Sequence, residues 1–134
     1  MTNVFAYGTL QFPQVVHAVT GRHFDTCPGR LEGYARYRLT TVDYPGVIPE
    51  SGAITEGAIL LDVDSHSLRR INDYEGRLYR FIELPVVLPN GCVIDAGVYV
   101  IAHRYRRRII KQTWSSAYFQ EYCLGAYLSR NRLR

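Results

Sequence analysis

DSHSLRRINDYEGRLYR, residues 64–80, predicts a short helix that ends at a glycine and is soon followed by a strand. Asp64 is a good N-cap residue, and Gly76 suits the position just beyond a helix C-terminus. The helix is therefore expected to run from residue 65 to residue 74 or 75. A strand is expected to begin at Tyr79.

Glu75 is placed on the apolar stripe of this helix. Leu68, Ile71 and Glu75 fall at i, i+3 and i+7, so the acid faces the core if the helix reaches it. Desolvation raises the pKa of a carboxyl, and the negative end of the helix dipole acts in the same direction. Both effects suit a residue that transfers protons. The alternatives are a frayed last turn that points Glu75 to solvent, or an ion pair with Arg77 or Arg80.

Short strands and turns make up most of the remaining chain. Turn signals occur at residues 28–29, 44–46, 51–52 and 90–91, and Asn-Gly at the last of these is the strongest short hairpin signal. Many short strands with few helices predict an α+β or β-barrel-like domain. The further expected elements are strands at 2–7, 30–39, 54–63, 79–88 and 92–101, and helices at 13–20 and about 116–128. In the strand 30–39, the even-numbered residues, which include Arg36, are expected on the more exposed face.

A second candidate site is the segment Tyr7-Gly8-Thr9-Leu10, here named the YGTL loop, between the first strand and the first helix. Successive backbone N–H groups in such a turn form a nest that binds a carboxylate or an oxyanion. The alternative is an ordinary turn glycine. Tyr79 and Tyr99 lie in the strands after Glu75 and would offer hydroxyls to the same site, unless they only pack.

The length of 134 residues allows one domain, and 47% hydrophobic residues exclude a disordered chain. Charge is uneven, because residues 1–103 carry eight arginines against eleven acids, whereas residues 104–134 carry seven arginines and Lys111 against Glu121. Such a basic tail would suit RNA, DNA or phospholipid, but a solvated surface explains it equally well. Residues 1–103 contain no RNA-recognition or helix-turn-helix signature, so no specific nucleic-acid partner is expected.

The cysteines and histidines predict neither a disulfide framework nor a metal site. Cys27, Cys92 and Cys123 are far apart and odd in number, and the four histidines show no HxH, HxxxH or HExxH spacing. No segment has the roughly 20 apolar residues of a membrane span, and no leader pattern opens the chain. We therefore expect a cytoplasmic protein without metal or membrane association.

The motifs VFAYGTL, LRRINDYEGRLYR and the strand ending in VYV, in that order, resemble the gamma-glutamylcyclotransferase-like family over about residues 3–101. The resemblance implies a small mixed β-barrel with a few short helices. It makes residues 1–134 one domain, on which residues 102–134 pack as a basic aromatic extension. It also implies an enzyme that cyclises a gamma-glutamyl group to 5-oxoproline and releases an amine or amino acid. No cofactor is implied.

By position, the resemblance assigns the proton-transferring acid to Glu75. It assigns substrate binding to Tyr7, Gly8, Thr9, Leu10, Tyr79 and Tyr99. The expected partner is a small gamma-glutamyl compound, and the sequence does not indicate which leaving amine it carries or which oligomeric state the protein adopts. A rival hypothesis is a catalytically silent protein that binds a small carboxylate or a peptide end on the same fold.

Overall fold

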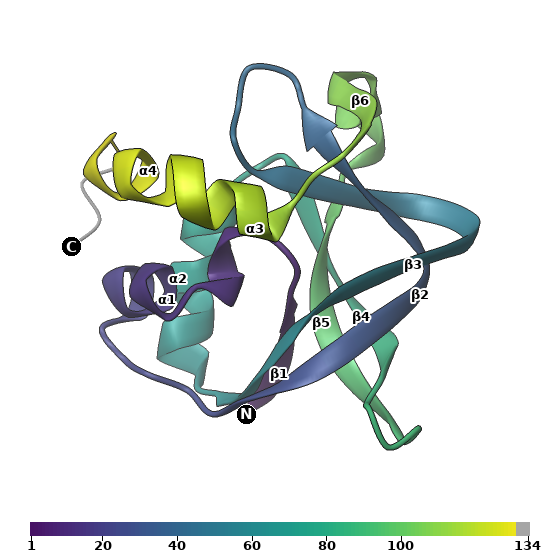
Figure 1. Cartoon of the computed structure of the whole chain (residues 1–134). Helices are drawn as coiled ribbons and strands as arrows, with labels where there is room; N and C mark the ends of the chain where they lie inside the picture. The colour runs from purple at the N-terminus through teal and green to yellow at the C-terminus, as the bar shows by residue number, and fades with distance from the viewer. Residues whose placement is uncertain (131–134) are drawn as a thin grey trace.

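A computed structural model describes residues 1–130 and contains a closed five-stranded barrel (Figure 1). The strands of the ring are β1 (Thr2–Ala6), β2 (Thr26–Leu39), β3 (Pro45–Val63), β4 (Tyr79–Val87) and β5 (Val93–Ile101). They pair in the order β1–β3–β2–β4–β5, and β5 pairs back with β1. The β5–β1 pairing is parallel and the other four are antiparallel. The predicted small mixed barrel of the α+β class is confirmed.

Most of the helical structure gathers on one side of this barrel (Figure 1). The helices there are α1 (Pro13–Thr20), α2 (Ser65–Glu75) and a C-terminal run of α3 (Ser116–Tyr118), the π-helical segment η3 (Phe119–Cys123) and α4 (Leu124–Arg130). Two short 3₁₀ segments, η1 (Thr9–Gln11) and η2 (His103–Arg108), follow β1 and β5. The end of β1 therefore leads directly into the helical side.

β1 contributes to two hydrophobic cores because successive strand residues point to opposite faces. Val4 and Ala6 belong to the core that includes Ile71 of α2 and residues of the C-terminal helical run. Phe5 and Tyr7 belong to a second core formed by residues of the barrel strands. The residues that follow β1 thus lie where the two cores meet.

β2 and β3 are longer than the sequence predicts. The turns predicted at 28–29 and 51–52 lie inside these strands. The chain reverses at residues 40–44, so the turn predicted at 44–46 matches the reversal only at Tyr44, and β3 begins at Pro45. Gly29 pairs with Gly57, and a Cβ on Gly29 would lie 2.8 Å from the Val86 side chain. Gly52 has φ of +82° and lies in a bulge of the β2–β3 ladder. These glycines allow close packing and bulging, which the sequence pattern alone does not distinguish from a turn.

The helices and the hairpin nearest the candidate site agree with the sequence. α1 and α2 have the predicted bounds, and Asp64 caps α2 by accepting a 3.1 Å hydrogen bond from the Ser67 N–H. β4 and β5 form the predicted antiparallel hairpin, with Gly91 in the turn at φ of +86°. Glycine is favoured there because this conformation crowds any other side chain.

The C-terminal segment contains a strand that the sequence analysis did not predict. β6 (Ile109–Thr113) pairs with the end of β2, and the helical run after it reaches residue 130. Trp114 and Phe119 are buried against the first core, with ring centroids 5.6 Å apart. Residues 131–134, with Arg132 and Arg134 of the predicted basic tail, lie outside the described residues. No helix within residues 1–130 combines the length and apolar character needed to cross a bilayer.

Candidate active site

A cavity of about 220 Å³ lies where the end of β1 meets α2, β4, β5 and α4. All seven residues that the sequence analysis assigned to a site line it. They are Tyr7, Gly8, Thr9, Leu10, Glu75, Tyr79 and Tyr99. Segments separated by more than sixty residues in the sequence are thus brought to one place, and the functional role of each remains a prediction.

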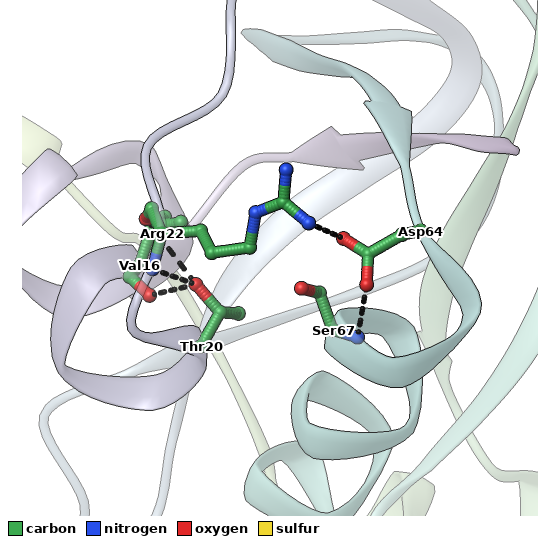
Figure 2. A network of polar contacts seen from close by, with 5 residues as sticks. All are labelled: Val16, Thr20, Arg22, Asp64 and Ser67. Atoms are coloured by element: carbon green, nitrogen blue, oxygen red, sulfur yellow. Dashed lines mark hydrogen bonds and ion pairs between the residues drawn. The ribbon is translucent and has the colours of Figure 1, made fainter.

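The start of α2, the helix that ends at Glu75, is held by an N-cap and an ion pair. Figure 2 shows the polar contacts between the end of α1 and the start of α2. Arg22 Nη1 lies 3.2 Å from the Asp64 carboxylate, and the Thr20 hydroxyl donates to the Val16 carbonyl oxygen at the end of α1. Hydrogen bonding from Ser67 is the main cause that holds the pKa of Asp64 below its usual range. The cap fixes the first turn of α2, and the ion pair joins this turn to the end of α1; α2 then runs to Glu75 at the cavity.

The Glu75 carboxyl is half-buried and has no hydrogen bond or ion pair with any residue in the described part of the chain. The alternative of an ion pair with Arg77 or Arg80 is therefore not what the structure contains. Desolvation by burial raises the pKa of Glu75 to about 8. A carboxyl with such a pKa exchanges protons near neutral pH, which an ordinary glutamate does not.

Tyrosine hydroxyls tie the walls of the cavity together. The Tyr7 hydroxyl donates to the carbonyl oxygen of Tyr99, and the Tyr99 hydroxyl donates to Asn72 Oδ1. The Tyr79 hydroxyl donates to the carbonyl oxygen of Pro45 at 2.7 Å. Their O–H groups are thus used within the protein, so Tyr79 and Tyr99 can offer a ligand an oxygen lone pair or a ring face.

Two further tyrosines that line the cavity, Tyr74 and Tyr127, were not predicted as site residues from the sequence. The Tyr74 hydroxyl lies 2.8 Å from Thr9 Oγ1 and is hydrogen-bonded to the Tyr127 hydroxyl. Burial raises the pKa of Tyr74 and Tyr127, and the nearby Glu75 charge adds to this. Tyr74 could have been suspected from its place beside Glu75, whereas Tyr127 lies in a helix without a recognisable motif.

The YGTL loop lines the cavity and leads into the 3₁₀ turn η1. The first hydrogen bonds of the 3₁₀ turn come from Gln11 N to Gly8 O at 3.1 Å and from Phe12 N to Thr9 O at 3.2 Å. The amides of Gly8, Thr9 and Leu10 precede them and have no acceptor within the described residues. A Cβ on Gly8 would lie 2.9 Å from Pro45 Cδ, so the loop needs glycine to pack here.

Arg36 supports this loop from β2, although the sequence analysis expected it on the exposed face of its strand. Its guanidinium donates to the Tyr7 carbonyl oxygen at 2.8 Å and lies 5.3 Å from the Trp114 ring. No carboxylate within residues 1–130 forms an ion pair with it. Burial lowers the pKa of Arg36. The alternation pattern of β2 gave no sign that one of its arginines is half-buried.

No group of three or more His, Cys, Asp or Glu side chains in the described part of the chain is gathered as a metal site requires. The cysteines are unpaired there, with Cys92 exposed. Metal independence of any reaction remains a prediction.

The fold and the site together define a class of protein. It is a small mixed barrel in which a glutamate at the end of a helix faces a tyrosine-lined cavity, beside a loop with the sequence YGTL. The family model described as "Gamma-glutamyl cyclotransferase, AIG2-like" matches residues 4–116. The chain belongs to this family, which confirms the resemblance seen in its motifs.

Two curated relatives illustrate the likeness. Protein AIG2 C from Arabidopsis thaliana is 32% identical over 99 residues, which cover 73% of this chain and 60% of that protein. Gamma-glutamylcyclotransferase and putative RNase MJ0434 from Methanocaldococcus jannaschii is 34% identical over 100 residues, or 73% of this chain and 45% of that protein. The chain spans between 42% and 60% of the length of the curated relatives it matches.

Solved structures share the fold over nearly the whole chain. An Arabidopsis thaliana protein solved in solution has a TM-score of 0.76 and 25% identity, covering 98% of this chain and 79% of that one. A structure described as gamma-glutamyl cyclotransferase has a TM-score of 0.62 and 16% identity, covering 97% and 85%. At this identity the second likeness concerns the fold alone.

Proposed function

We propose that the protein is a gamma-glutamyl cyclotransferase-type enzyme, which converts a gamma-glutamyl amine or amino acid into 5-oxoproline and a free amine. The observation that carries this proposal is the Glu75 carboxyl, which faces the cavity without a polar partner among residues 1–130 and has a pKa raised to about 8 by burial. Membership of the Gamma-glutamyl cyclotransferase, AIG2-like family supports it.

The reaction needs a proton carrier and a clamp. The α-amine of the substrate attacks its own γ-carbonyl carbon, so the nucleophile belongs to the substrate. Glu75 as carboxylate takes a proton from this amine as the new C–N bond forms, and gives it to the leaving nitrogen as the old C–N bond breaks. A carboxyl whose pKa is close to that of the attacking amine and of the leaving nitrogen favours both proton transfers.

The YGTL loop is the proposed clamp. The amides of Gly8, Thr9 and Leu10 would bind the α-carboxylate of the substrate or the oxyanion that develops on its γ-carbonyl. The loop would hold one end of the flexible glutamyl chain while the cavity folds the other end. The amine and the carbonyl carbon of the substrate are then held close together, which speeds their reaction. The tyrosine hydrogen bonds keep the walls in place for this purpose.

Incubation with a panel of gamma-glutamyl amino acids and gamma-glutamyl amines, followed by measurement of 5-oxoproline, tests the proposal. We expect at least one member of the panel to be converted, with one free amine released for each 5-oxoproline formed. Saturable binding of 5-oxoproline or of panel members without any turnover would instead favour the silent binding protein.

A further inference from the structure

A second hollow lies against the proposed active site. It is a shallow groove of about 500 Å³, and Tyr79 lines both the groove and the cavity. The residues of this groove, here named the basic groove, are Arg77, Tyr79, Arg80, Ala102, His103 and Arg104. Arg77 and Arg80 come two and five residues after Glu75, so the chain runs from the carboxyl straight into the groove.

The charge of the basic groove is strongly one-sided. It contains three arginines and a histidine, and no aspartate or glutamate lines it. The ion pairs of residues 1–130 use Arg22, Arg30, Lys111 and Arg130, so the groove arginines are not neutralised by a carboxylate in that part of the chain. Exposed guanidinium groups of this kind bind carboxylates, often through two parallel hydrogen bonds.

The position of the groove matches the path of the leaving amine. In the proposed reaction the glutamyl part stays between the YGTL loop and Glu75, and the released amine is the part that extends out of the cavity. Tyr79 lines both hollows, so we place a substituent that extends past this residue in the basic groove. A carboxylate on this substituent would then lie among the groove arginines.

We propose that the basic groove binds the leaving amine and selects gamma-glutamyl compounds whose leaving amine carries a carboxylate. This inference rests on the proposed function and narrows it to a substrate class. The groove takes no part in bond making: the proton still passes from the attacking amine to the leaving nitrogen, and the arginines act on a charge further along the departing group.

Gamma-glutamylglycine and gamma-glutamylglycinamide provide a matched pair of substrates. They have nearly the same shape and differ in whether the leaving amine ends in a carboxylate or a neutral amide. We expect kcat/KM to favour the carboxylate by roughly fivefold or more, mainly through KM, and the preference to shrink at high salt because exposed charges are screened.

The double variant Arg77→Glu/Arg80→Glu should bring the ratio of the two kcat/KM values to one or below. Arg69→Glu is the control, since Arg69 is an exposed arginine of α2 that lines neither hollow, and it should leave the ratio unchanged. Turnover of both substrates with equal kcat/KM would overturn the groove proposal and leave the proposed function intact.

Binding provides a readout that does not depend on turnover. In the Glu75→Gln protein, titration with gamma-glutamylglycine should shift the backbone NMR signals of Arg77, Arg80 and Arg104 more than titration with gamma-glutamylglycinamide. Equal shifts, or shifts confined to the YGTL loop, would contradict the groove proposal. Failure of the normal protein to form 5-oxoproline from any gamma-glutamyl compound would contradict the proposed function separately.

Discussion

The guanidinium of Arg36 donates a 2.8 Å hydrogen bond to the carbonyl oxygen of Tyr7, which shares its peptide bond with the Gly8 N–H. A cation on the carbonyl side polarises this peptide and makes its N–H a stronger donor. Arg36 therefore strengthens the Gly8 amide, a donor of the proposed clamp, without lining the cavity itself.

Replacement of Arg36 by methionine should weaken binding of the gamma-glutamyl substrate by roughly tenfold, because a charge-assisted hydrogen bond to the loop is lost. The effect should appear in KM more than in kcat, and Arg36→Lys should recover part of it. Equal KM values for the methionine variant and the normal protein would contradict a role of Arg36 in the loop.

A carboxylate should bind against the backbone of Gly8, Thr9 and Leu10. These amides lack acceptors within the described residues, and a small anion satisfies them. Crystals soaked with 5-oxoproline should show its carboxylate there. Ligand density elsewhere in the cavity, with the loop amides bonded to other protein groups, would reject the proposed clamp.

Stability should depend on pH through Glu75. Its pKa is about 8 in the folded protein against an ordinary value of 4.5, so between these pH values the folded chain holds a proton that the unfolded chain has released. The free energy of unfolding therefore falls as pH rises from about 4.5 to about 8.

Glu75→Gln cannot ionise and should lack this loss. Relative to the normal protein, its free energy of unfolding should increase by about 1 kcal/mol or more between pH 5 and pH 9. Urea unfolding at a series of pH values measures the difference. Parallel stability curves for the two proteins would mean that the carboxyl has an ordinary pKa.

Gly57→Ala should destabilise the barrel, whereas Gly125→Ala should not. A Cβ on Gly57 would lie 2.3 Å from the Ala6 carbonyl oxygen, and this backbone cannot move without parting β1 from β3. We expect a loss of at least about 2 kcal/mol from such overpacking. Gly125 lies in α4 with open space around it, so alanine there should add roughly 0.5–1 kcal/mol through helix propensity. Thermal unfolding of both variants tests the contrast.

The sequence predicts the parts of the fold that depend on local patterns. The N-cap at Asp64 and the glycine at 76 mark the ends of α2, and the spacing of Leu68, Ile71 and Glu75 places the acid on the inner face. Local patterns do not distinguish a turn glycine from one that permits close packing. For this reason the sequence predicts a turn at Gly29, although this residue lies inside β2.

The contacts that complete the candidate site could not be predicted, because they join distant segments. The Tyr127 hydroxyl, from the C-terminal helix, is hydrogen-bonded to the Tyr74 hydroxyl. The Arg36 guanidinium points inward because it donates to the Tyr7 carbonyl oxygen and lies over the Trp114 ring. Nothing in the local sequence distinguishes Tyr127 from the other aromatic residues of its helix, or Arg36 from the other arginines of its strand. Only the closing of the barrel and the docking of α4 bring Tyr127 to the cavity and Arg36 to the carbonyl oxygen of Tyr7.

The central claim is that Glu75 carries the proton in a cyclisation that forms 5-oxoproline. Its most direct test compares 5-oxoproline formation by the normal protein and by Glu75→Gln, which keeps the size of the side chain and removes the base. We predict a fall in turnover of roughly 10²- to 10⁴-fold, with the variant still folded and still binding substrate. Turnover by Glu75→Gln at the rate of the normal protein would contradict the account.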